Sequence, residues 1–370
     1  MNMLKKFAVT NFRGFKDRIE WDLSHPSNYT FNQGAIKDGI IKNGIIYGPN
    51  GAGKSNFSLA LFDIENHLSQ KEKNPNYYIN FVYAGRPESP VVFEYTFQFG
   101  DRVIYYAYSK NRAGLLVDEK LVVDSKQKFY MHNASFEIDE SEFPMDPTVK
   151  KNVIENANHL SIVNFLLTRF PLPKGHYLIE LQNFANSMLW FRSLGINEYI
   201  GLETGVTQLE DYIISHKLLD DFKDFLYEVS GQQFDFIEPK AGDKRIFCKI
   251  ENNIVPFSII RSTGTNSLIL LYYWYKTLAA DHASFVFIDE FDAFYHFKLS
   301  FEVCKRLFAQ KCQIFTSSHN TYLMTNDLLR PDCNFILNHN KIKPLNECTE
   351  KELRFGHNIE KLYRGGAFKS

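Results

Sequence analysis

The sequence predicts an α/β fold with a mixed sheet, an antiparallel β meander and a helical insertion. Three observations support this fold. A glycine-rich stretch at 48–55 joins an apolar run of strand type to a segment with helical spacing. Strand-like segments at 91–99, 103–108 and 115–123 then follow one another, with turn residues between them. Apolar residues recur at helical intervals through 149–230, without the long heptads of a coiled-coil arm.

The glycine-rich stretch is the first candidate site. It fits the phosphate-loop pattern Gly-x-x-x-x-Gly-Lys-Ser and lies directly after the apolar run Ile45–Tyr47. Glycines let successive N–H groups converge on one anion, and the dipole of the following helix points to the same place. We expect Lys54 to place its charge between the outer phosphates of a nucleotide and the Ser55 hydroxyl to ligate Mg²⁺. The candidate nucleotide-binding residues of this stretch are Gly48, Pro49, Asn50, Gly51, Ala52, Gly53, Lys54, Ser55 and Asn56.

The composition is that of a folded protein with a sizeable core. The chain has 370 residues, 44% hydrophobic and 15% aromatic, which suits one large domain or two ordinary ones. Its net charge of −1 gives no overall basic field for a nucleic acid, although a local basic groove is compatible with it. The five cysteines show no Cys-x-x-Cys spacing, as is typical of reduced thiols. Without an apolar leader or a stretch long enough to span a bilayer, we expect a cytoplasmic protein that is not in a membrane.

The two ends of the chain carry further strand signals. Residues 3–23 alternate as a β-hairpin, with its turn at Arg13 to Lys16. A second hairpin is expected at 245–259, around the turn at 251–253. Ser262 and Gly264 then precede the helical run 268–278. Together they form either a second anion site or an ordinary helix N-cap.

An apolar strand that ends in two acids is the strongest signal after the glycine-rich loop. Phe285–Ile288 is followed directly by Asp289 and Glu290, which is the Walker B pattern. A buried parallel strand brings such carboxylates to the sheet edge where ligands bind in open α/β folds. We expect Asp289 to hold Mg²⁺ through water and Glu290 to polarise the attacking water. A further strand begins at Gln313 and ends near His319.

Taken together, these motifs resemble the ordered motif set of an ABC-type ATPase. The loop at 48–55, the Ser262–Thr265 segment, Asp289-Glu290 and His319 carry the resemblance. Lys54 and Asp289 lie 235 positions apart, and this wide separation resembles the split heads of the SMC/RecF/Rad50-like branch. The string Val9–Phe15 ahead of the loop is similar to the opening of that group. The resemblance covers roughly residues 1–110 and 245–340.

This resemblance implies ATP and Mg²⁺ as cofactors and assigns further roles. The hairpin would lie beside the adenine, where Arg13 either stacks on the base, pairs with a phosphate or stays solvated. His319 would contact the γ-phosphate as the switch histidine, unless it is structural. Asp292 would be the D-loop residue that reaches across a dimer. A glutamine of the Q-loop has no assigned position, because Gln98 falls inside a strand pattern.

The same resemblance sets the expected domain organisation. We expect the N-terminal half of the head at 1–110 and a strand continuation with a helical insertion (149–230) at 111–244. The C-terminal half is expected at 245–345 and a tail at 346–370. The heads would form an ATP-dependent head-to-tail homodimer or higher oligomer, in which Ser262 and Gly264 complete the site of the partner.

Within that branch, the short insertion, the Ser-x-Gly-Thr segment and the end of the chain (358–368) resemble stand-alone ATPases of bacterial phage defence. These are the abortive-infection, PARIS-type and overcoming-lysogenisation-defect-like ATPases. The resemblance implies a slow ATPase that senses infection and controls a separate effector chain, such as a TOPRIM-type nuclease. Two alternatives remain: a RecF-like DNA-repair ATPase that binds DNA ends or gaps, and a nucleotide-operated scaffold with little turnover.

Overall fold

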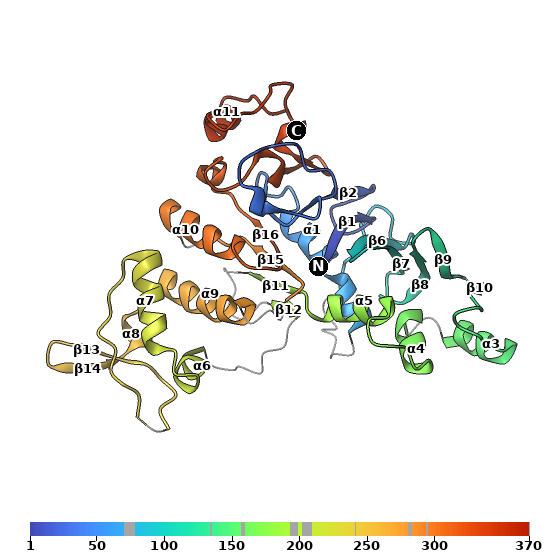
Figure 1. The fold of residues 1–370 in the computed structure, drawn as a ribbon, viewed down its shortest axis with the longest axis horizontal. Coiled ribbons are helices and arrows are strands. Elements are labelled where there is room, and N and C mark those ends of the chain that lie inside the picture. Colours follow the sequence, from blue (N-terminus) through green and yellow to red (C-terminus); the bar gives the residue numbers. More distant parts are fainter. Residues whose placement is uncertain are drawn as a thin grey trace.

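The fold is built on two seven-stranded sheets. The computed structural model describes residues 1–69, 78–133, 135–156, 160–192, 199–201, 209–240, 242–279, 283–293 and 295–369. One sheet is antiparallel, with strand order β10-β9-β8-β7-β6-β1-β2. The other is mainly parallel, with order β12-β11-β15-β16-β5-β17-β18, and we call it the central sheet. In Figure 1 the antiparallel sheet lies on one side of the central strands, and helices α7, α9 and α10 lie on the other.

The antiparallel sheet follows the alternation of apolar residues along its strands. In β6 every second side chain from Val91 to Phe99 is buried, so one face of the strand meets the core. The hairpin expected at 3–23 is the β1–β2 pair, in which Phe7 lies opposite Trp21. The strands of this sheet are β1 (Asn2–Thr10), β2 (Ile19–Asp22), β6 (Val91–Phe99), β7 (Arg102–Lys110), β8 (Leu116–Val123), β9 (Lys126–His132) and β10 (Ser135–Ile138).

The central sheet is made of short strands, and the middle ones are buried along their whole length. Strands β11, β15, β16, β5 and β17 run parallel to one another. Parallel strands covered on both faces read as continuous apolar runs, as Phe285–Ile288 does. The strands are β5 (Asn43–Tyr47), β11 (Leu189–Arg192), β12 (Tyr199–Gly201), β15 (Phe285–Asp289), β16 (Gln313–Ser317), β17 (Asn334–Asn338) and β18 (Lys341–Pro344).

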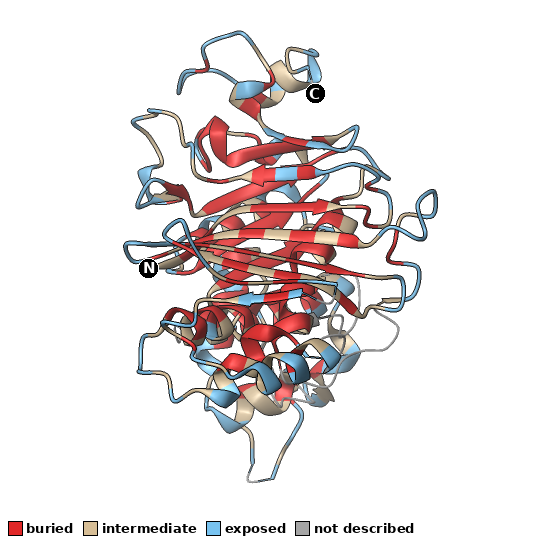
Figure 2. Ribbon diagram, turned by 90° about the vertical axis from the view of Figure 1, so that its right-hand side faces the viewer, coloured by how far each residue is buried: buried red, intermediate tan, exposed pale blue. Residues whose placement is uncertain are grey.

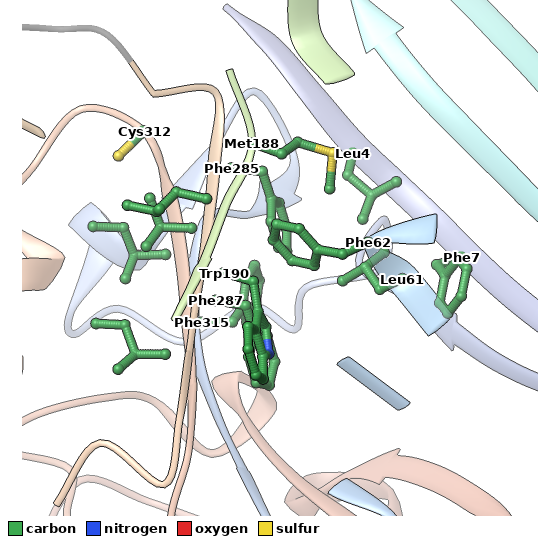
Figure 3. Packing of buried hydrophobic residues seen from close by; sticks show 14 of the residues in the cluster. Leu4, Phe7, Leu61, Phe62, Met188, Trp190, Phe285, Phe287, Cys312 and Phe315 are labelled. Carbon is green, nitrogen blue, oxygen red and sulfur yellow. The ribbon is translucent and has the colours of Figure 1, made fainter. Parts of the chain in front are cut away.

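Helix α1 (Lys54–Leu61) packs between the two sheets, against β1 on one side and β15 on the other. Figure 3 shows the resulting core, where Leu61 and Phe62 lie between Leu4 and Phe7 of β1 and the aromatic side chains of the central sheet. Trp21 also joins the layers, because its ring meets Phe57, Phe315 and Phe335 edge to face. Buried residues accordingly fill the space between the layers, whereas exposed ones lie in the loops and on the outer faces of helices (Figure 2).

The remaining elements are helices and short strands. Helix α2 contacts α5, and α10 contacts α7. No helix of the described residues is long and apolar enough to cross a membrane. The helices are α2 (Asp63–Leu68), α3 (Pro147–Asn156), α4 (Ile162–Arg169), α5 (Tyr177–Asn186), α6 (Leu209–Ser215), α7 (Leu219–Ser230), α8 (Phe257–Ile260), α9 (Thr263–Ala279), α10 (Phe297–Phe308) and α11 (Ile359–Arg364). The short strands are β3 (Ile36–Lys37), β4 (Ile40–Ile41), β13 (Phe247–Ile250) and β14 (Asn253–Pro256).

The segment 149–230 differs from the compact helical insertion that the sequence suggests. It contains helices, but it also contains β11, which pairs in parallel with β15 and so belongs to the central sheet. The run Leu189–Phe191 is so short that the spacing of its apolar residues cannot distinguish a strand from the end of a helix. Its pairing with β15 shows that it is a strand. Residues 157–159, 193–198 and 202–208 of this segment lie outside the described residues.

A buried carboxylate ties the antiparallel sheet to α4. Glu119 of β8 is fully buried and accepts hydrogen bonds from the N–H groups of Ile162 and Val163 and from the Tyr106 hydroxyl. Burial raises the pKa of Glu119 to about 7, although these hydrogen bonds and Lys110 act in the opposite direction. The His67 imidazole lies 4.0 Å from the same carboxylate.

We expect the stability of the fold to decrease as the pH rises, because of Glu119. Its folded pKa is raised above its unfolded value, so the folded state holds the extra proton and loses stability as that proton leaves. Between pH 5.5 and pH 8 this group should lower the free energy of unfolding by about 2 kcal/mol. Urea unfolding of the wild type and of Glu119→Gln at both pH values measures the effect. An equal pH dependence in the two proteins would contradict it.

Candidate nucleotide site at the edge of the central sheet

The carboxyl ends of four neighbouring strands meet at one edge of the central sheet. The strands lie in the order β11, β15, β16 and β5, all parallel. They end at Arg192, Asp289, Ser317 and Tyr47 respectively. Since the chain leaves each strand at the same edge, the glycine-rich loop, the two acids and the His319 segment are brought together there.

Three glycines of the loop 48–53 occupy positions where a side chain would be strained or would clash. Gly51 and Gly53 have positive φ angles of 79° and 98°. A Cβ on Gly48 would lie 2.4 Å from the Leu337 carbonyl oxygen, and a Cβ on Gly53 would lie 2.8 Å from the Phe15 ring. The N–H of Ala52 donates to the Pro49 carbonyl at 3.1 Å, which closes the turn. Helix α1 begins at Lys54, directly after this turn.

Lys54 is buried within its own loop. Its Nζ donates to the Gly48 carbonyl at 2.8 Å and lies 3.4 Å from the Pro49 carbonyl. Burial lowers the pKa of the Lys54 ammonium, and the nearby carboxylates of Asp289, Glu290 and Asp292 act in the opposite direction. The ammonium is therefore bound by its own loop and lies near enough to these acids to be affected by their charge. Ser55 and Asn56 occupy the first turn of α1 beside it.

The Ser317 hydroxyl is hydrogen-bonded to both acidic residues at the end of β15, to the side chain of Asp289 and to the backbone of Glu290. Ser317 of β16 donates to Asp289 Oδ1 at 2.6 Å, and the Glu290 N–H donates to the same Ser317 oxygen at 2.8 Å. Glu290 has a φ of 49°, in the left-handed region that a residue with a side chain adopts at a cost. The Glu290 side chain is 25% exposed, whereas Asp289 is fully buried.

A pocket of about 440 Å³ is lined by Glu290 but not by the buried Asp289. Its walls include four of the residues predicted from the sequence. Burial and the charge of Lys54 lower the pKa of His319, whereas Glu290, Asp292 and Asp289 act to raise it. Asp292 accepts a hydrogen bond from Ser318 at 2.7 Å, and burial raises its pKa. The pocket is lined by Asn50, Glu290, Asp292, Ala293, Tyr295, His319 and Asn320.

The other predicted site residues do not line this pocket: the rest of the 48–56 stretch, Asp289, Arg13, Ser262 and Gly264. Arg13 has a positive φ of 44° and its guanidinium donates to Asn56 Oδ1 at 3.1 Å, so it lies against the start of α1. Ser262 is exposed and accepts from the Thr265 N–H at 3.1 Å, which is the hydrogen bond of an N-cap. Gly264 follows in the first turn of α9. This helix contacts the pocket through Ser267, whose hydroxyl lies 2.8 Å from that of Tyr295.

The sequence interpretation missed one charged residue of the site, Arg192. In the sheet register it lies directly opposite Asp289. Its Nε and Nη2 donate to Asp289 Oδ2 at 3.2 and 3.1 Å, and its Nε lies 3.9 Å from Glu290 Oε2. Arg192 could have been found from the sequence only by assigning Leu189–Phe191 to a strand, because its contact with Asp289 follows from the pairing of β11 with β15.

The donors at this edge suit a cation that shares its ligands with a phosphate. The described residues contain no group of three or more His, Cys, Asp or Glu that could form a complete metal site. Ser55 offers a hydroxyl and Asp289 a carboxylate. Mg²⁺ is commonly held by one or two such groups, with phosphate oxygens and waters completing its octahedron. The residues therefore fit Mg²⁺ bound together with a nucleotide.

Comparisons with known proteins gave no match to a protein-family model and none to a curated protein. Among solved structures, the chain is similar to the SMC head domain from Thermotoga maritima, at 16% identity and a TM-score of 0.46, covering 92% of this chain and 98% of that one. The chain is also similar to a Smc head bound to the C-winged helix domain of ScpA, at 15% identity and a TM-score of 0.47. That match covers 92% of this chain and 97% of the other. A third similar structure is a Smc head with an extended coiled coil, bound to the C-terminal domain of ScpA from Pyrococcus furiosus. Its identity is 12% and its TM-score 0.44, and the match covers 94% of this chain and 98% of the other.

Proposed function

We propose that this chain is an ABC-type ATPase of the SMC/RecF/Rad50-like branch that binds Mg²⁺-ATP and hydrolyses it slowly. The observation that carries the proposal is the gathering of three motifs at one sheet edge. Asn50 of the glycine-rich loop, Glu290 after β15 and His319 after β16 line one pocket. Lys54 lies close enough to the acids for their charges to affect its pKa. Phosphoryl transfer to water needs a cationic phosphate-binding loop and a water-positioning group close together, and this gathering supports the proposal.

Each residue then has a role in binding or in hydrolysis. The N–H groups of the loop and of the first turn of α1 receive the phosphates, and Lys54 exchanges its carbonyl partners for phosphate oxygens. Ser55 and Asp289 would hold Mg²⁺, which would supply positive charge at the outer phosphates. Glu290 orients the attacking water, and His319 contacts the γ-phosphate. Arg13 and Asn56 lie at the start of α1, on the side where the base is expected.

Nucleotide binding and phosphate release by the purified chain test this proposal. We expect the wild type to bind a fluorescent ATP analogue and to release phosphate slowly when Mg²⁺ is present. Lys54→Ala should weaken both, because it removes the point charge from the phosphate cradle. Lys223→Ala, on the exposed face of α7, is the matched control. Failure of the wild type to bind ATP would refute the proposal.

We also propose that two chains form a head-to-tail dimer with two ATP molecules between them. Ser262 and Gly264 do not line the pocket of their own chain, and they would complete the site of the partner. ATP would then stabilise the dimer by mass action. Light scattering of Glu290→Gln with and without ATP measures this. A monomer under both conditions, well above micromolar concentration, would contradict it.

The biological output that we propose is control of a separate effector in phage defence, as the sequence resemblance implies. The chain would sense infection and hold or release its partner according to the bound nucleotide. Cells that express the chain with and without its operon neighbours can be challenged with phage. Protection that needs Lys54, Glu290 and a neighbouring gene supports the proposal. Sensitivity to DNA damage without any phage phenotype would favour the RecF-like repair function instead.

A further inference from the structure

The buried Asp289 carboxylate already has a cationic partner within the chain. Arg192 donates twice to Asp289 Oδ2, and Ser317 donates once to Oδ1. The carboxylate is fully buried, whereas the Arg192 side chain keeps 28% of its surface exposed. A buried carboxylate without a partner is strongly destabilising, so the guanidinium neutralises a charge that the fold could not otherwise hold there.

The same carboxylate is the one that Mg²⁺ would approach. Two donors occupy the lone pairs of Oδ2, and the charge of Asp289 is compensated before any metal arrives. A divalent cation that approaches Asp289 also meets the positive charge of Arg192 a few ångströms away. The guanidinium and the metal therefore compete for one carboxylate.

Arg192 has a second acid within reach when it leaves Asp289. Its Nε lies 3.9 Å from Glu290 Oε2, beyond hydrogen-bond distance but close enough for attraction. Glu290 lines the pocket in which the outer phosphates are expected. The exposed part of the side chain allows this movement, whereas Asp289 is fixed by Ser317.

We propose that Arg192 takes the place of the divalent cation on Asp289 while the site is empty, and that metal binding displaces it toward Glu290 and the pocket. This inference rests on the proposed function, because that function is what makes Asp289 a metal ligand. Arg192 would then help to set the affinity of the site for the metal, because the metal must displace it from Asp289. It also links the end of β11 to the occupancy of the metal site, because Arg192 is the last residue of that strand.

Metal binding by charge-neutral and charge-conserving variants tests the proposal. Mn²⁺ is the probe, with its affinity measured by electron paramagnetic resonance and by its effect on Tm, both with and without a non-hydrolysable ATP analogue. Arg192→Gln should bind Mn²⁺ at least about tenfold more tightly than the wild type, because the competing charge is gone. Arg192→Lys should lie between the two. Arg306→Gln, whose guanidinium pairs with Glu228 on the surface, should match the wild type.

A purely structural role for Arg192 would give the opposite result. Arg192→Gln would then lower Tm and weaken Mn²⁺ binding together, and that outcome overturns the proposal. If Arg192→Gln does not fold, Arg192→Met, which is also uncharged, decides the question, and an unchanged Mn²⁺ affinity in that variant also overturns it. Failure of all proteins to bind the ATP analogue refutes the ATPase function alone. The measurement with Mn²⁺ and no nucleotide still decides the role of Arg192.

Discussion

Glu290→Gln should bind ATP as tightly as the wild type and hydrolyse it at least about 100-fold more slowly. The substitution removes the carboxylate that orients and polarises the attacking water, and such a group typically contributes two to four orders of magnitude to the rate. It leaves the loop 48–53 and Lys54 unchanged, so the phosphates keep their contacts. Phosphate release under saturating ATP, together with a binding titration of the fluorescent analogue, measures both quantities.

The structure indicates that Glu290→Gln changes the carboxylate and leaves the backbone around it unchanged. Glutamine has nearly the shape of glutamate and the same backbone preferences, so the left-handed φ of 49° costs the two residues about the same. The N–H of residue 290 still donates to Ser317, which keeps the end of β15 in place. Glu350→Gln, on the surface, serves as the matched control. Hydrolysis by Glu290→Gln at the wild-type rate would show that another group orients the water.

The sequence allowed the local parts of this site to be predicted, because each depends on neighbours along the chain. The loop at 48–55 needs glycine at fixed spacing, and the acids need an apolar run before them. Asn50, Glu290, Asp292 and His319 do line one pocket, as their motifs suggested. Their roles in catalysis remain predictions.

The parts that could not be predicted depend on strand order. Arg192 reaches Asp289 only because β11 pairs with β15, and the two strands lie 97 positions apart along the chain. Ser317 likewise looks, in the sequence, like any other residue of a buried strand. Its hydroxyl reaches Asp289 because β16 is the neighbour of β15 and ends level with it. Neither contact has a local sequence signature, since a pairing partner is chosen by the whole sheet.

Gly48→Ala should weaken ATP binding at least about tenfold and lower Tm. The new methyl group would lie 2.4 Å from the Leu337 carbonyl oxygen and 3.3 Å from the Ala52 Cβ. Leu337 belongs to β17, the parallel neighbour of β5, so the obstacle is backbone that cannot rotate away. Either β17 or the loop must move. We expect a loss of roughly 1–3 kcal/mol in stability, as for other overpacked sites, together with a displaced phosphate cradle.

Two other glycines serve as comparisons for Gly48→Ala. Gly34→Ala should leave both stability and ATP binding unchanged, because its Cβ would meet nothing within 4 Å and its φ is not in the left-handed region. Gly51→Ala would also meet nothing, but its φ of 79° adds strain of about 1 kcal/mol or more without a clash. Thermal unfolding and titration with the fluorescent ATP analogue rank the three variants. If Gly48→Ala binds ATP as tightly as Gly34→Ala, the contact with Leu337 does not set the shape of the loop, and the geometry proposed for phosphate binding is wrong.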